Sequence, residues 1–299
     1  MPLVPRPVRA GFRVLGTLAP PLAVELAVLA MRRVGPPARI RPADQAVHDA
    51  ARRDVVRVDG ERVATYAWGS PSAPPVLLAH GWQLRASRFA RLAEALEAAG
   101  LQPVAFDGVA HGDSTGRRTQ AVQHAAALRA VQERTGPAIA VVGHSLGATA
   151  AGLALRDGLA ADRFVSVAAP TGFDSVIGSF VRQSGLPSRL HDRLASRAGS
   201  VMFRGVTDPR TNLDLTRHPV PAHVPTLFVQ STPDSMNDPD NARLLHAAHP
   251  GSELLLVDGL GHNRLLDDPG VLTAVVDHVT TNVPTIDPAR SSTGAETAR

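Results

Sequence analysis

Short apolar runs alternate with helical stretches along most of the chain, and this alternation constrains the possible folds more than any other feature. Continuous apolar strands separated by helices are typical of a parallel sheet that is buried on both faces. The expected strands are residues 75–79, 104–106, 138–142, 164–168, 226–230 and 253–257, and the expected helices include residues 86–99, 120–134 and 148–155. An antiparallel hairpin around Asp59-Gly60 is predicted before them. In such a sheet the ligand site lies at the carboxyl ends of the strands.

One of the loops at these ends reads Gly143-His144-Ser145-Leu146-Gly147, between an apolar strand and a helix. A G-x-S-x-G sequence arises by chance ~0.1 times in a chain of this length. The glycines let strand and helix approach closely, and the tight turn presents the serine hydroxyl above the sheet edge at a helix N-terminus, where negative charge is stabilised. We therefore predict that Ser145 is a nucleophile, with a helix-capping serine as the alternative.

A serine hydroxyl needs a general base that is oriented by a third group. Of twelve histidines, His262 directly follows the last expected strand, at the same sheet edge as Ser145. Asp234 follows the strand at residues 226–230 and precedes His262 in the chain, as an orienting acid would. Asp238 and Asp240 stay as alternatives, because the sequence does not fix the register of this loop.

Stabilising the developing oxyanion requires two hydrogen-bond donors. The backbone N–H of Leu146, directly after the predicted nucleophile, is one candidate. The backbone N–H of Trp82, in His80-Gly81-Trp82-Gln83 after the strand at residues 75–79, is the other.

The composition excludes much alternative chemistry. The 299-residue chain has no cysteine, and all 31 of its basic residues are arginine. Without cysteine there is no thiolate, disulfide or Cys-ligated zinc, and without lysine no Schiff base or P-loop lysine. We expect an oxygen nucleophile that works with no cofactor and no metal.

The net charge of +4 is modest, and no arginine-rich run is interleaved with aromatic residues. We therefore expect no nucleic-acid partner. The high isoelectric point, near 10.9, reflects the choice of arginine over lysine.

The motifs, taken in chain order, resemble the α/β-hydrolase family over about residues 55–281. They are His80-Gly81-Trp82, Asp107, His111-Gly112-Asp113-Ser114, the pentapeptide around Ser145, Asp234 and Gly261-His262. The resemblance implies an α/β fold with a mostly parallel eight-stranded sheet flanked by helices, and a small helical cap inserted after the sixth strand, at about residues 170–221. It also implies the roles already given to Ser145, Asp234, His262, Trp82 and Leu146.

The chain departs from the family pattern at three places. Ser231 stands where members commonly have glycine before the acid, Pro233 directly precedes Asp234, and Val109-Ala110 replaces the usual residues before His111. We interpret residues 111–114 as structural support for the site. A serine nucleophile disfavours the dehalogenases and epoxide hydrolases of the family, which use aspartate.

Residues 1–36 form an apolar and basic extension. Pro20-Pro21 interrupts its apolar run and Glu25 lies inside it, which disfavours a signal peptide or membrane span. We predict a short helix over residues 22–33, packed on the domain or over its pocket entrance, with peripheral membrane contact through residues 14–33 as the alternative. The hydrolase domain is expected over residues 50–282, and a disordered tail over residues 283–299.

The leading hypothesis is a serine hydrolase that cleaves a small-molecule carboxylic ester through an acyl-enzyme intermediate. Apolar cap residues favour an apolar acyl or alcohol group, and the predicted pocket residues are Phe173, Ile177, Phe180 and Met202. Perhydrolase, thioesterase or amidase activity on the same triad remains an alternative, as does a non-catalytic binding protein of the same fold. We expect a cytoplasmic location, with membrane association as the alternative, and the sequence leaves the oligomeric state open.

Overall fold

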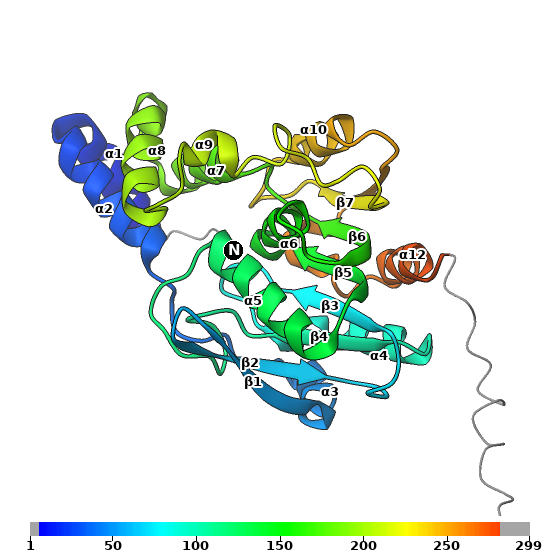
Figure 1. Ribbon diagram of the computed structural model, residues 1–299. Helices are drawn as coiled ribbons and strands as arrows, with labels where there is room; N and C mark the ends of the chain where they lie inside the picture. Colours follow the sequence, from blue (N-terminus) through cyan, green and yellow to red (C-terminus); the bar gives the residue numbers. More distant parts are fainter. Residues whose placement is uncertain (1–5, 282–299) are drawn as a thin grey trace, which may run out of the picture.

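The computed structural model describes residues 6–281, and its centre is an eight-stranded sheet with the order β1-β2-β4-β3-β5-β6-β7-β8 (Figure 1). The pairs β1–β2 and β2–β4 are antiparallel, and all other neighbours are parallel. The strands are β1 (Arg52–Val58), β2 (Glu61–Ala67), β3 (Pro75–Ala79), β4 (Gln102–Phe106), β5 (Ala138–His144), β6 (Ala161–Val167), β7 (Thr226–Thr232) and β8 (Glu253–Asp258). The predicted fold class is confirmed.

Alternate residues of the central strands enter two separate apolar cores, as the two-residue period of a strand requires. In β3, Leu77 packs in the core under α5 (Ala121–Thr135) and α6 (Leu146–Arg156). Its neighbours Val76 and Leu78 pack in the core under α4 (Ala90–Ala98) and α12 (Pro269–Thr280). Because both faces are covered, the strands read as continuous apolar runs.

The cap lies between β6 and β7, within the predicted range. It consists of α7 (Phe173–Ser184), a 3-10 turn η3 (Ser188–Leu190), α8 (His191–Met202) and α9 (Pro209–Asn212). An antiparallel bridge between Gly172 and Asp214 joins the two ends of the insertion. The cap therefore returns to the sheet close to where it leaves it. The remaining elements are η1 (Pro42–Asp44), α3 (Gln45–Ala50), η2 (Ala86–Phe89), α10 (Asp240–Ala248) and α11 (Gly261–Arg264).

The N-terminal extension forms two helices, α1 (Arg6–Leu18) and α2 (Pro20–Arg32), which lie beside α8 (Figure 1). The sequence predicts one helix from residue 22. The structure begins α2 at Pro20, since proline at the first helical position loses no intrahelical hydrogen bond. The buried side of α2, which includes Ala23, Ala27 and Val28, packs on the domain. The tail predicted over residues 283–299 lies outside the described residues.

No helix within residues 6–281 has both the length and the apolar character that crossing a bilayer requires.

A partly buried charge cluster joins the segment before β1 to the C-terminal part of the chain. Arg41 binds both Asp44 and Asp267, and Arg88 donates to Asp267 at 3.1 Å and to the carbonyl of Asn263 at 3.1 Å. Burial opposes ionisation of Asp267, but the hydrogen bonds and charges of Arg41 and Arg88 outweigh it and lower its pKa to about 2. The stabilisation that Asp267 contributes to this cluster is therefore present only while its carboxylate is ionised.

We expect Asp267→Asn to lower the free energy of unfolding by about 1–3 kcal/mol at pH 7, because two guanidinium groups lose a charged acceptor. The folded pKa of Asp267 is depressed, so its contribution is complete above the ordinary value of 3.8 and is lost as the pH falls toward about 2. The difference between variant and wild type should therefore shrink over that interval in urea unfolding curves. Asp277→Asn, at an exposed site on α12, is the control, and an equal deficit at every pH would contradict the assignment.

Candidate active site

Ser145 lies in a strained turn between β5 and α6, with φ 54° and ψ −119°. Its backbone N–H donates to the carbonyl of Val167 at 2.8 Å. Gly143 and Gly147 lie too close to neighbouring backbone atoms for any other residue to replace them without a clash. A Cβ on Gly143 would lie 2.4 Å from the Cα of Ala148, and one on Gly147 would lie 2.0 Å from the carbonyl oxygen of Ala79 in β3. This geometry is that of a nucleophile elbow.

Asp234 and His262 are joined directly, although β7 and β8 bring them from different loops. The ring Nδ1 of His262 lies 2.7 Å from Oδ2 of Asp234. The carboxylate also accepts from the backbone N–H groups of Met236 and Asn237 and from the Gln230 amide. Burial raises the pKa of Asp234, but the hydrogen bond and charge of His262 and the two backbone N–H groups outweigh it and leave the pKa below its ordinary value.

An ionised Asp234 fixes the state of the His262 ring. A carboxylate only accepts, so the contact at 2.7 Å requires a proton on Nδ1 of His262. In the neutral ring Nε2 is then free to accept a proton. Ser145 and His262 line one cleft, together with Gly81 and Trp82. The Ser145 hydroxyl makes no hydrogen bond to any residue of the range 6–281, His262 included, so the contact between nucleophile and base is open in this structure.

The alternative acids lie elsewhere in the loop. Asp238 is exposed and accepts from the backbone N–H of Asp240 at 3.2 Å, and neither carboxylate hydrogen-bonds to His262 within the described chain. Of the three candidates, the geometry brings Asp234 to the histidine.

Ser231 connects the acid loop to the histidine loop. Its hydroxyl accepts from the N–H of Gly261 at 2.8 Å, and the carbonyl of Thr232 accepts from Gly259 at 2.8 Å. The serine that departs from the family pattern therefore holds the residue next to His262. The sequence shows the departure but not this contact.

His144, beside the predicted nucleophile, also supports the histidine loop. Its Nε2–H donates to the carbonyl of His262 at 3.0 Å, and the two rings lie 4.8 Å apart. Burial, followed by the charge of His262, lowers the pKa of His144 to about 3, which keeps the ring neutral. The sequence gives no sign of this contact.

The backbone N–H groups of Trp82 and Leu146 donate to no group within residues 6–281, and both residues border the cavity beside Ser145. The loop that carries Trp82 is held by His111, whose Nε2 accepts from the N–H of Gln83 at 3.0 Å. This contact agrees with the interpretation of residues 111–114 as support. The arrangement leaves two unused donors next to the serine, as an oxyanion hole needs.

His80, His111 and His124 bring their ring nitrogens within 4.8 Å of one another, close enough to suggest a metal site. Both nitrogens of His80 bind backbone groups of Gly81 and Gly108, and both of His111 bind Val109 and Gln83. A metal would have to displace these hydrogen bonds, so the cluster fits loop support better than metal binding.

A cavity of about 290 Å³ opens beside Ser145, and its wall comes from the cap, the loop after β3 and the end of α2. Three of the predicted pocket residues line it: Phe173, Phe180 and Met202. The prediction for Ile177 is wrong. This side chain is fully buried in the same apolar cluster as Leu190 and Leu194, because the face of α7 that carries Val176 and Phe180 turns to the cavity instead.

The end of α2 and the residue that follows it complete the cavity wall. Ala30, Met31 and Arg33 line it, and Phe12 of α1 packs edge-on against Phe180, with the ring centres 6.3 Å apart. The helix of the N-terminal extension thus covers part of the pocket. The sequence predicts a helix at the pocket entrance but does not identify Met31 as a lining residue.

The profile of the α/β-hydrolase family matches residues 76–275, so the chain belongs to this family of hydrolases. No curated protein matches the sequence at a significant level.

Three solved structures show the same fold at low sequence identity. An esterase of Pyrococcus furiosus is 18% identical, with a TM-score of 0.62 over 84% of this chain and 97% of that chain. Naproxen esterase of Bacillus subtilis is 16% identical, with a TM-score of 0.56 over 78% and 93%. A bacterial membrane phospholipase A, described as a virulence factor, is 17% identical, with a TM-score of 0.58 over 92% and 98%.

We expect Gly147→Ala to lower the free energy of unfolding by about 3 kcal/mol or more, because its Cβ would meet rigid backbone of β3 at 2.0 Å. Gly11→Ala is the matched control. Its Cβ meets no atom within 4 Å, and alanine favours the helix, so stability should change by less than about 1 kcal/mol. Urea unfolding followed by circular dichroism compares the two, and equal stabilities would refute the proposed close approach.

Proposed function

We propose that this protein hydrolyses carboxylic esters through Ser145, His262 and Asp234. The observation that carries the proposal is the 2.7 Å contact between His262 Nδ1 and an ionised Asp234, in a cleft shared with the serine of a strained elbow. A protein that only binds a ligand has no need of an imidazole oriented in this way beside a strained serine. The contact between His262 and Asp234 therefore disfavours a non-catalytic binding protein.

In the first step, Oγ of Ser145 attacks the ester carbonyl carbon while Nε2 of His262 takes the hydroxyl proton. Asp234 accepts the Nδ1–H bond and stabilises the imidazolium that forms. The N–H groups of Trp82 and Leu146 bind the oxyanion. The bond to the alcohol oxygen then breaks, and Nε2 returns its proton to that oxygen. Water repeats the sequence on the acyl-enzyme and releases the acid.

The substrate class follows from the cavity wall. Aromatic and aliphatic side chains, including Phe173, Phe180 and Met202, dominate it, so it favours an uncharged apolar group next to the carbonyl. Proteins of the same fold are named as esterases and as a phospholipase A, which is consistent with an ester substrate.

Ser145→Ala should reduce hydrolysis of p-nitrophenyl butyrate by at least about 10³-fold, because the acyl-enzyme cannot form. A fluorophosphonate probe should label the wild type and leave this variant unlabelled. Equal turnover by wild type and variant would overturn the mechanism, and absence of labelling in an active wild type would move the nucleophile to another residue.

The acid can be tested separately from the nucleophile. Asp234→Asn should lower kcat by about 10³- to 10⁴-fold with a smaller effect on KM, because the His262 ring loses the tautomer that frees Nε2. Asp238→Asn, four residues on and exposed, should retain full activity. The reverse ranking would assign the acid to Asp238.

A further inference from the structure

Exposed apolar side chains gather on α1 and α2, which we call the N-terminal hairpin. Of seven large apolar side chains that are exposed within residues 6–281, six belong to it, and they are between 41% and 79% exposed. These are Val8, Val14, Leu18, Leu22, Leu26 and Leu29, and the seventh is Leu244 on α10. The rest of the described surface therefore exposes a single large apolar side chain, whereas the hairpin exposes six of them close together in the chain.

On α2 the pattern is regular. Leu22, Leu26 and Leu29 recur at i, i+4 and i+7 and so share one side of the helix. The side that carries Ala23 and Ala27 is already buried on the domain. The outer leucines therefore lie on the side of α2 away from the domain, where they are 41–58% exposed.

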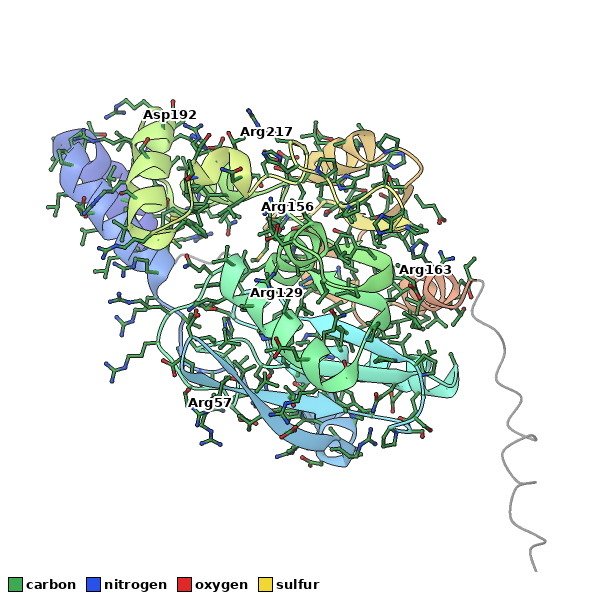
Figure 2. The ribbon with its side chains drawn as sticks, in the orientation of Figure 1. Arg57, Arg129, Arg156, Arg163, Asp192 and Arg217 are labelled. Carbon is green, nitrogen blue, oxygen red and sulfur yellow. The ribbon has the colours of Figure 1, made fainter. Side chains whose placement is uncertain are left out.

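The positive charge of the protein lies in the same segment. The chain has 31 basic and 27 acidic residues, and residues 1–33 hold five of the basic and one of the acidic, which leaves 26 of each for the remainder. Arginines of the remainder, such as Arg57, Arg163 and Arg217, are spread over separate parts of the molecule (Figure 2). The charge excess of the whole protein thus resides in its N-terminal segment.

Little within the described chain neutralises this charge. Arg6, Arg9 and Arg13 of α1 form no ion pair with any carboxylate of residues 6–281, and the same holds for Arg32 and Arg33 at the end of α2. The one carboxylate of the hairpin, Glu25, is bound by Arg197 of α8 at 2.6 Å. The hairpin therefore presents leucines together with free guanidinium groups.

The geometry points to the N-terminal hairpin as a docking surface for an anionic lipid bilayer. The outer leucines enter the acyl region, and the arginines bind lipid phosphates at the headgroup level. A second copy of the chain fits the same surface less well. Pairing would bring two N-terminal segments together, each with an excess of four positive charges, and they would repel each other. Neither helix can cross the bilayer, so the hairpin would lie along its surface.

Docking would also bring the cavity beside Ser145 close to the lipid surface. Ala30, Met31 and Arg33, at the end of α2, line the cavity that reaches Ser145, while Leu29 lies on the outer side of the same turn. The pocket wall would then face the lipid surface. The docking does not depend on the proposed ester hydrolysis, since the contacts that carry it are those of the hairpin alone.

The test is co-sedimentation of the full chain with phosphatidylcholine vesicles, with and without phosphatidylglycerol. We expect binding to the vesicles that contain phosphatidylglycerol, weakened by added salt. The triple variant Leu22→Gln, Leu26→Gln, Leu29→Gln should bind at least about tenfold more weakly, because three apolar side chains leave the bilayer. Leu244→Gln, which alters an equally exposed leucine outside the hairpin, should bind like the wild type.

Two controls distinguish bilayer docking from misfolding of the variant and from self-association of the wild type. The triple variant should keep the wild-type unfolding curve and the wild-type turnover of a water-soluble ester, which shows that it is folded. Light scattering of the wild type should show no larger species than that of the variant. The proposal is overturned if the wild type does not bind the vesicles that contain phosphatidylglycerol, or if the triple variant binds them as well as the wild type does. It is also overturned if the substitutions instead dissociate an oligomer.

Discussion

The close approach of the turn at residues 143–147 to strand β3 is the constraint on which the site depends. The space between Gly147 and the carbonyl of Ala79 is too small for any side-chain carbon. In the same tight turn Ser145 has a positive φ of 54°, which a serine adopts only under strain. The close approach also places the start of α6 against the end of β3, so that the free N–H groups of Leu146 and Trp82 border the same space.

Neutral histidines hold the loops around this turn in place. Burial lowers the pKa of His80, His111 and His144, and a neutral ring can both donate and accept a hydrogen bond. His111, for example, donates to Val109 and accepts from Gln83, beside Trp82. A charged imidazolium could not accept from a backbone N–H. The dry, apolar surroundings of these rings are therefore part of what positions the candidate oxyanion donors.

The sheet, the cap and the residues around Ser145 could be predicted from the sequence because each depends on a local pattern. Continuous apolar runs predict buried strands, and the glycines at 143 and 147 predict a tight turn. Contacts between segments that are remote in the chain could not be predicted, because the sequence does not give the distances between them. His144 meets the backbone of His262 across 118 residues, and Ser231 meets Gly261 across 30. Ile177 could not be separated from the pocket residues by sequence, because an apolar residue on α7 can face either the core or the cavity.

Helix α2 lies outside the sheet but forms part of the pocket wall. Its inner side packs on the domain, its last turn lines the cavity through Met31, and its outer side carries Leu22, Leu26 and Leu29. Apolar side chains lie on both the inner and the outer side of α2, and an apolar helix side is normally buried. The described chain buries only the inner side, and free arginines flank the rest. The outer side of α2 is the surface that the proposed anionic bilayer would cover.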